Sequence, residues 1–290
     1  MRFEGEIVPR ADISEAVRDG ALQMGMTTPA NDQDLLGNVA FILGAPGFPA
    51  GPKSIEYAAW FYQGDGKAFL NDVYKDFGYV IGMPYFSLAE LFCHSNVKLE
   101  TADDLKGIKF RTFGLWAEIM NDDFGASVVM LPGAELYGAM ERSVIDAFEY
   151  ASPSFNYPMG FHEVAKYVGV PGIHSPMSAY IAVVNKEAWD KLPADLQTIL
   201  ESETQAAGFR ALLDVTYEDG LAMMQYADYG TEFVTVSDAL QQDIAAASRN
   251  WVLEAAAADP VFRQIWESQQ TFIKAFRSYN EAQPKYSIYD

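Results

Sequence analysis

The sequence has one cysteine and three histidines, and it has half as many basic as acidic side chains. A lone cysteine, Cys93, cannot form a disulfide within the chain or build a cysteine-ligated metal site. With 20 Lys and Arg against 40 Asp and Glu, the formal net charge is −20. Because such a field repels phosphates, the composition argues against nucleic acid as a partner. An anionic small molecule would need local cationic groups to be held.

Long hydrophobic runs are also missing. The most apolar stretch, residues 38–51, is interrupted by two glycines and two prolines and is too short to cross a bilayer. The first twenty residues carry charged side chains throughout and contain no apolar segment of the kind found in a signal peptide. The sequence as given therefore predicts a water-soluble chain without a signal peptide in it.

Several catalytic motifs are absent as well. The chain has no Gly-x-Ser-x-Gly elbow, no Walker-type phosphate loop, no dinucleotide Gly-x-Gly-x-x-Gly and no His-Glu-x-x-His. Cys93 and His94 are adjacent in sequence, which is poor geometry for a nucleophile and its base. An α/β enzyme acting on a carboxylate substrate stays the main alternative to a binding protein, and a ligand sensor for a signalling partner is a third reading.

The sequence does contain short predicted strands and helices in alternation. Strands are predicted at residues 5–9, 22–26, 79–83, 108–111, 127–131, 144–149, 178–184 and 231–236, and helices at 14–20, 54–76, 115–124 and 133–141. Short loops between a strand and the next helix favour an α/β fold with parallel sheets flanked by helices. The fold class is therefore α/β.

The length and one long helix indicate two lobes. A chain of 290 residues with 50% apolar content can form two cores. Residues from about 186 to 226 are nearly free of Gly and Pro, which predicts a helix long enough to connect the lobes. We assign residues 1–97 and about 186–238 to the first lobe, and about 98–185 and 239–290 to the second. Composition and periodicity thus indicate an α/β chain of two lobes with a long connecting helix.

Three phrases carry a family resemblance: Gly107-Ile-Lys-Phe-Arg-Thr-Phe-Gly, the run from Phe124 to Met140, and Val144-Ile-Asp-Ala-Phe-Glu. Their order and spacing resemble the solute-binding proteins of TRAP transporters. Further phrases, Gly160-Phe-His-Glu and Pro171-Gly-Ile-His, look most like the branch that binds 2-oxo acids and related monocarboxylates. The resemblance implies a two-lobed, periplasmic-binding-protein-like clamp. Such a binding subunit captures a small organic acid by hinge closure and delivers it to TRAP membrane subunits.

The resemblance also names site residues. Arg111 falls at the family's carboxylate-anchoring arginine, and it ends a predicted strand where open α/β sheets bind ligands. Its planar guanidinium can form a bidentate pair with a carboxylate. Glu149 and Tyr150 match a Glu-Trp pair whose glutamate binds a metal ion in the oxo-acid branch. Thr28 follows a strand where relatives place aromatics, and His174 could line the cleft.

Two serines argue against a metal ion. Ser175 stands where the branch has a second metal-binding acid, and Ser87 aligns loosely with a glutamine that helps to hold the metal. A divalent cation held by Glu149 alone would lack much of its usual charge and ligand count. The sequence therefore requires no cofactor, and calcium or sodium stays an alternative. Both serines could instead hydrogen-bond the hydroxyl or keto oxygen of a ligand.

The resemblance further implies a periplasmic location and a missing beginning. Family members carry a signal peptide, a first strand and a first helix before the segment that matches residues 5–9, so we expect upstream sequence. The C-terminal helix places Phe262, Ile265, Trp266, Phe272 and Phe276 at helical spacing, which predicts that it packs on a lobe. In some relatives this helix helps to form a homodimer, and a homodimer is an option here.

Overall fold

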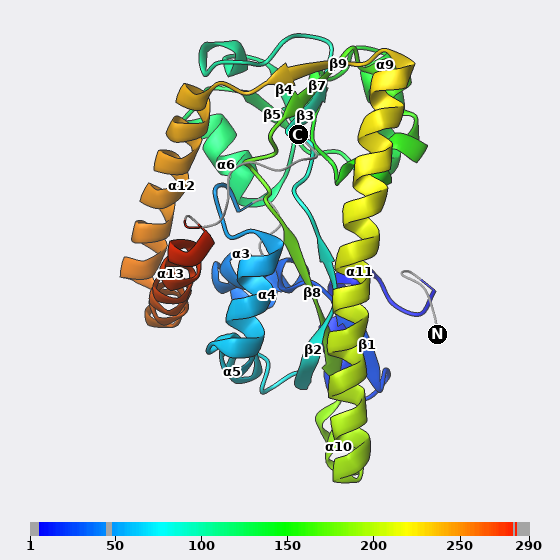
Figure 1. Ribbon diagram of the computed structural model, residues 1–290, viewed down its shortest axis with the longest axis vertical. Helices are drawn as coiled ribbons and strands as arrows, with labels where there is room; N and C mark the ends of the chain where they lie inside the picture. The colour runs from blue at the N-terminus through cyan, green and yellow to red at the C-terminus, as the bar shows by residue number, and fades with distance from the viewer. Residues whose placement is uncertain (1–5, 45–47, 281, 283–290) are drawn as a thin grey trace.

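The computed structural model describes residues 6–44, 48–280 and 282, and it contains two β-sheets (Figure 1). A three-stranded sheet has the order β1-β8-β2, formed by β1 (Met24–Thr27), β8 (Ser178–Val184) and β2 (Tyr79–Ser87). Both pairings in this sheet are antiparallel. The α/β fold class is confirmed, but the parallel order predicted for the sheets is wrong here.

The second sheet has six strands in the order β5-β4-β6-β3-β7-β9. Its strands are β3 (Cys93–Ser95), β4 (Lys109–Arg111), β5 (Ser127–Val129), β6 (Ala147–Phe148), β7 (Tyr167–Val170) and β9 (Glu232–Thr235). β4 runs parallel to β5 and β6, and β7 runs parallel to β9, whereas β3 is antiparallel to both neighbours. The chain enters β3 directly from the other sheet and without a crossover helix, which explains the reversed strand.

Helices cover the sheets on their outer sides (Figure 1). They are α1 (Ile13–Arg18), α2 (Gln33–Leu36), α3 (Val39–Gly44), α4 (Ser54–Gln63), α5 (Gly66–Val73), α6 (Gly114–Asp122), α7 (Leu136–Glu141), α8 (Pro153–Asn156), α9 (Phe161–Val164), α10 (Lys186–Asp190), α11 (Ala194–Tyr229), α12 (Asp238–Ala258) and α13 (Pro260–Asn280). The single helix predicted over 54–76 is divided because Gly64 leaves helical geometry, with φ −106° and ψ −151°. The strand predicted at 5–9 is also wrong in its described part, residues 6–9, which precede a 3₁₀ turn that starts at Arg10.

The long helix predicted after residue 186 is confirmed as α11, which has 36 residues and begins after Pro193. It stands along one side of the molecule and passes both sheets (Figure 1). Lys67 on α5 forms a 2.6 Å ion pair with Glu201 near the start of the helix. Asp219, further along, accepts hydrogen bonds from Ser152 and Ser154 at the start of α8. α11 therefore ties together elements that belong to the surroundings of both sheets.

We expect Asp219→Ala to lower the free energy of unfolding by about 2 kcal/mol, because hydrogen bonds to a buried carboxylate are worth more than neutral ones. Asp219 Oδ1 receives three hydrogen bonds, of 2.6 to 2.9 Å, and the residue is buried. Urea denaturation would measure the loss. Asp214→Ala, an exposed acid on the same helix, serves as the control and should change stability by less than about 0.5 kcal/mol. Equal effects of the two substitutions would contradict the anchoring role.

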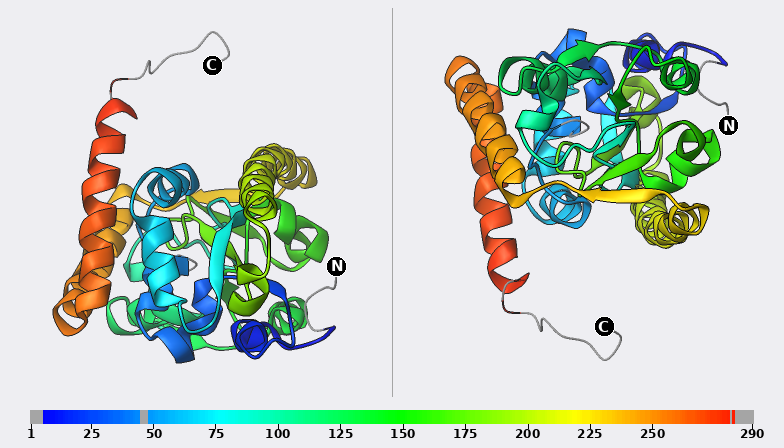
Figure 2. Two further views of the ribbon diagram at one scale, coloured as in Figure 1. Left: turned by 90° about the horizontal axis from the view of Figure 1, so that it is seen from below. Right: turned by 90° about the horizontal axis from the view of Figure 1, so that it is seen from above.

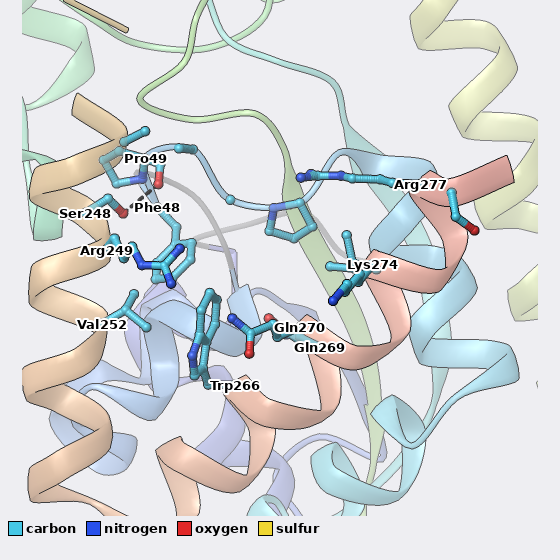
Figure 3. A pocket seen from close by; sticks show the side chains of 16 residues that line it. Phe48, Pro49, Ser248, Arg249, Val252, Trp266, Gln269, Gln270, Lys274 and Arg277 are labelled. Carbon is cyan, nitrogen blue, oxygen red and sulfur yellow. Dashed lines mark hydrogen bonds between the residues drawn. The ribbon is translucent and has the colours of Figure 1, made fainter. Parts of the chain in front are cut away.

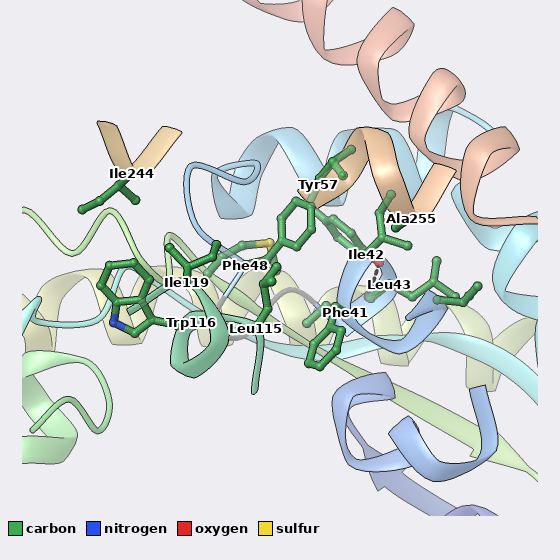
Figure 4. Close-up of a cluster of buried hydrophobic side chains, with 14 of the residues drawn as sticks. Phe41, Ile42, Leu43, Phe48, Tyr57, Leu115, Trp116, Ile119, Ile244 and Ala255 are labelled. Carbon is green, nitrogen blue, oxygen red and sulfur yellow. Dashed lines mark hydrogen bonds between the residues drawn. The ribbon is translucent and has the colours of Figure 1, made fainter. Parts of the chain in front are cut away.

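The largest hydrophobic cluster joins α3, α4, α6 and α12 (Figure 4). Trp116 and Tyr57 are fully buried in it. The predicted packing of the C-terminal helix is confirmed, since Phe262 and Ile265 are fully buried and α13 lies against α3, α4 and α5. This cluster fixes the segment that follows β4, and hence the position of Arg111.

The boundaries of the two lobes stay a prediction. β8 belongs to the three-stranded sheet, and β3 and β9 belong to the six-stranded sheet. If each sheet is the centre of one lobe, residues 178–184 join the first lobe and residues 93–97 and 232–235 join the second. We propose these revised boundaries.

Candidate binding site between the two sheets

Two adjacent segments carry the chain from one sheet to the other. Residues 88–92 lead from β2 to β3, and residues 171–177 lead from β7 back to β8. They run side by side, since the Glu90 amide donates to the Ser175 carbonyl at 3.0 Å and the Phe92 amide to the Gly169 carbonyl at 2.9 Å. Gly172 makes the closest approach, because a Cβ built there would lie 1.8 Å from the Glu90 carbonyl oxygen. Both crossing segments contribute side chains to the site.

Arg111 ends β4 and is buried beside Glu149. The parallel pairing of Arg111 with Phe148 on β6 brings the next residue, Glu149, next to the guanidinium. Nε donates to the Leu131 carbonyl at 2.9 Å, and Nη1 donates to the backbone oxygen of Glu149 at 2.8 Å and to its Oε1 at 3.3 Å. Nη2 has no hydrogen bond within the described chain, and the guanidinium lies 5.4 Å from the centre of the Phe113 ring. One edge of Arg111 is thus available to an anion.

The half-buried Glu90 and the buried Glu149 and His174 form a group whose ligand atoms lie within 4.8 Å of one another. His174 Nε2 lies 3.3 Å from Glu90 Oε2, while its Nδ1 is buried without a partner among the residues that the structure describes. Phe92 and Trp116 surround the imidazole ring. Two carboxylates therefore share a site with a single guanidinium.

Burial dominates the titration of this group. It raises the pKa of Glu149 to about 7, and the nearby Glu90 carboxylate raises it further while Arg111 opposes the shift. Burial likewise raises the pKa of Glu90 to about 7, against hydrogen bonding from Glu149 and Ser175 and the charge of Arg111. Burial lowers the pKa of His174 to about 4, so that the imidazole is neutral near pH 7.

A cavity of about 290 Å³ opens beside this group. Thr28, from the end of β1, and Tyr85, on β2, both line it. The Thr28 Oγ1 and Tyr85 hydroxyl atoms are buried and, within the described ranges, have no hydrogen-bond partner. Because buried polar groups are nearly always paired, two unpaired hydroxyls in one cavity indicate a place for a polar ligand.

Ser87, Tyr150 and Phe113 also line the cavity, and Arg10 adds a cationic side chain to it. Ser87 Oγ accepts a 2.8 Å hydrogen bond from the Ser178 amide, so the serine is partly occupied by the sheet. Tyr150 packs edge-on against Phe161, with ring centres 5.6 Å apart. The walls of the cavity are therefore aromatic, with hydroxyl groups between the rings.

The structure sorts the predicted residues into two layers. Thr28, Ser87 and Tyr150 line the cavity, and a buried layer next to it contains Arg111, Glu149, His174 and Ser175. Glu90 belongs to both layers, since it lines the cavity and contacts the buried group.

Sequence reasoning missed Glu90, and with it the second carboxylate. The objection to a metal ion rested on the serines at 175 and 87, but Glu90 reaches the place of Ser175 from the neighbouring crossing segment. One signal was available in the sequence: Glu90 is the only Asp, Glu, Lys or Arg between Asp76 and Lys98. A single acid in such a long uncharged stretch is costly to bury without a function.

A larger cavity, of about 560 Å³, lies between α12, α13 and residues 48–52 (Figure 3). Its lining includes Arg249, Lys274 and Trp266, and none of the predicted site residues. We assign the binding site to the smaller cavity, because that one has unpaired buried hydroxyls and adjoins the buried charges.

The arrangement suits reversible binding. It places one guanidinium, two carboxylates and several hydroxyls at the junction of two sheets. Proteins that close around a small solute commonly place their binding groups between two such parts of the chain. Within the described part of the chain, no helix is both long and apolar enough to cross a membrane. Fold and site together define a solute-binding protein.

Comparison with known proteins gives the family. Residues 3–259 match the model of bacterial extracellular solute-binding proteins, family 7, and the chain belongs to this family of TRAP transporter solute-binding proteins. It is accordingly a binding protein and not an enzyme.

Three relatives illustrate the similarity. A monocarboxylate 2-oxoacid-binding periplasmic protein of Nostoc is 30% identical over 277 residues, which is 95% of this chain and 75% of the relative. A solute-binding protein of Colwellia psychrerythraea, solved with bound calcium and pyruvate, is 27% identical with a TM-score of 0.85. The match covers 94% of this chain and 82% of the Colwellia chain. A protein of Pseudoalteromonas atlantica, solved with sodium and pyruvate, is 28% identical with a TM-score of 0.82, over 93% and 82% of the two chains.

Proposed function

We propose that this protein captures a small 2-oxo or hydroxy monocarboxylate for a TRAP transporter. The buried guanidinium of Arg111 is the observation that carries the proposal, because it offers a partner to a carboxylate and pairs with Glu149, which adjoins the cavity-lining Glu90. The cavity volume of about 290 Å³ suits a small ligand. The unpaired hydroxyls of Thr28 and Tyr85 supply partners for a keto or hydroxyl oxygen. The relatives of known ligand support the same class.

A cation fits the buried group. When both are ionised, Glu90 and Glu149 carry one negative charge more than Arg111 balances, and a bound carboxylate would add another in the same place. The carboxylate oxygens of Glu90 and Glu149 would hold the cation, and the Nε2 atom of His174 lies beside them, 3.3 Å from Glu90 Oε2. When bound, a calcium or sodium ion supplies counter-charge and accepts oxygen ligands. Calcium matches the charge count better than sodium.

The two crossing segments are the proposed hinge. Glu90 and His174 lie on these segments, whereas Arg111 and Glu149 lie at the C-terminal ends of β4 and β6 in the six-stranded sheet. A ligand that contacts both sets of residues stabilises the closed arrangement of the two sheets relative to the open one. We infer that the closed form docks on TRAP membrane subunits and that the protein works in the periplasm, as its family does.

A thermal-shift screen tests the function. The purified chain is tested with 2-oxo acids, hydroxy acids, dicarboxylates and sugar acids, each with calcium and with a chelator. We expect the largest rise in melting temperature with a 2-oxo or hydroxy monocarboxylate in calcium. A response confined to sugar acids or dicarboxylates would reject the proposed ligand class, and the absence of any response would reject the site.

Glu90→Gln tests the cation separately. We expect this substitution to raise the calcium concentration needed for half-maximal stabilisation about tenfold or more, because a carboxylate ligand is replaced by a neutral amide. Glu100→Gln, at an exposed position outside the site, is the matched control. Calcium titrations followed by thermal shift give the midpoint for each variant. A midpoint for Glu90→Gln equal to that of the control would remove Glu90 from the cation site.

A further inference from the structure

The cavity of about 560 Å³ between α12, α13 and residues 48–52, which we call the helix cavity, is lined by charges of one sign (Figure 3). Arg249 comes from α12, and Lys274 and Arg277 come from α13, whereas the described residues that line the cavity include no Asp or Glu. The whole chain has twice as many acidic as basic residues. The helix cavity therefore carries a charge opposite to that of the protein.

A neighbouring surface cavity shows that this charge is not general along α12. Its lining contains three Asp and one Lys, close to the ratio of the whole chain. In a protein with a formal net charge of −20, a cavity with basic side chains alone offers a local place for an anion.

Two of the three cations in the helix cavity have no counter-charge from the protein. Arg277 forms a bidentate ion pair with the buried Glu56, at 2.6 and 2.8 Å, so its charge is balanced. Arg249 and Lys274 form no ion pair and no hydrogen bond with the residues that the structure describes. Both are exposed, and salt and water weaken exposed charges. A ligand held firmly here must therefore also use the apolar wall.

The wall supplies a flat apolar surface. Trp266 is half-buried and lines the cavity together with Phe48 and Val252. Arg249 and Lys274 stand on either side of the space that Trp266 borders (Figure 3). An indole ring stacks well on another flat ring, and a guanidinium or ammonium group nearby can hold an anionic substituent of that ring.

The walls are fixed by hydrogen bonds. Ser248 Oγ on α12 donates to the Pro49 carbonyl at 2.6 Å, and the Ala50 amide donates to the Ile173 carbonyl at 2.8 Å. Residues 48–52 are thus tied to α12 and to one of the crossing segments. A cavity formed before the ligand arrives binds without a large cost of ordering.

We propose that the helix cavity is a second ligand site, which binds an organic anion with a flat apolar part, such as an aromatic carboxylate. The carboxylate lies against Arg249 and Lys274, and the ring lies against Trp266. The volume is nearly twice the 290 Å³ of the cavity between the sheets, which leaves room for an aromatic ring. The two cavities share no lining residue, so each can be tested while the other is intact.

Isothermal titration calorimetry of 2-naphthoate into the full chain tests the proposal. We expect one bound molecule per chain in the helix cavity. 2-Naphthol has the same rings without the charge, and acetate has the charge without the rings. Each should bind at least about tenfold more weakly than 2-naphthoate, because each lacks one of the two contributions. Equal binding of naphthol would reject an anion site, and equal binding of acetate would reject the aromatic class.

Gln270→Glu places an acid in the lining with little change of shape. We expect it to weaken 2-naphthoate binding about tenfold or more, because the new carboxylate repels the ligand. Gln264→Glu makes the same substitution on the same helix, at an exposed position outside the cavity, and should bind as the unmodified protein does. Equal affinities of the two variants would overturn the proposal.

Arg249→Gln/Lys274→Gln removes the two unbalanced charges and should also weaken 2-naphthoate binding about tenfold or more. Arg263→Gln/Lys166→Gln removes two exposed charges elsewhere and is its control. The response of the Arg249→Gln/Lys274→Gln variant to monocarboxylates in the thermal-shift screen should stay unchanged, so this result separates the second site from the proposed function.

Folded Arg111→Ala protein locates the probe. It should bind 2-naphthoate as the unmodified protein does, since Arg111 does not line the helix cavity. Loss of 2-naphthoate binding in Arg111→Ala would place the probe in the cavity between the sheets and overturn the proposal. The absence of any 2-naphthoate binding to the unmodified chain would overturn it as well.

Discussion

Replacing Arg111 by alanine is expected to lower the affinity for the carboxylate ligand by about 100-fold or more. The guanidinium is the only cationic group in the buried layer of the site, and its Nη2 edge is free for the ligand. Loss of one partner of a buried, hydrogen-bonded charge pair costs about 2–5 kcal/mol. Isothermal titration calorimetry in calcium would measure the loss, with the ligand identified by the thermal-shift screen.

Arg111→Lys separates charge from geometry. Lysine keeps the positive charge but cannot present two parallel N–H groups, so an intermediate affinity is expected. Arg263→Ala, at an exposed position on α13, is the control and should bind as the unmodified protein does. Because Arg111 also holds Glu149, the folded state of each variant must be verified by its melting curve. A folded Arg111→Ala protein with unchanged affinity would show that the carboxylate is anchored elsewhere.

The second large effect is expected at the crossing of the two segments. Gly172→Ala should destabilise the protein by about 3 kcal/mol or more, since the new Cβ would overlap the Glu90 carbonyl unless a backbone segment moves. The displaced segment carries Glu90, so cation and ligand binding should weaken as well. Denaturant unfolding and calcium titration measure the two effects.

Gly220→Ala is the matched control for this prediction. Gly220 lies on α11, and a Cβ built there meets no atom within 4 Å. Alanine in the middle of a helix is favoured over glycine, so the variant should be more stable by about 0.5–1 kcal/mol. If Gly172→Ala unfolds at the same denaturant concentration as the unmodified protein, the close approach of the crossing segments is not required for the fold.

Local patterns predicted the elements of the fold better than the order of the strands. The helix after residue 186 and the strand that ends at Arg111 follow from residue spacing and composition, which act over a few turns or residues. The antiparallel β1-β8-β2 sheet does not, because β8 is separated from both partners by long stretches of chain. The short strands β3 and β7 were also missed, since three or four residues give little periodicity.

The sequence by itself determined the family, the α/β class and the position of Arg111, because long phrases of fixed spacing carry that information. The tertiary structure alone placed Glu90 beside Glu149, because the two acids are far apart in the sequence. Glu90 follows β2 of the three-stranded sheet and Glu149 follows β6 of the six-stranded sheet, so they meet only where the two sheets adjoin. It also decided which apolar face of α11 is covered. Helical spacing gives two such faces, and only the packing of β2 and α8 on one of them leaves Phe209, Leu213 and Tyr217 exposed.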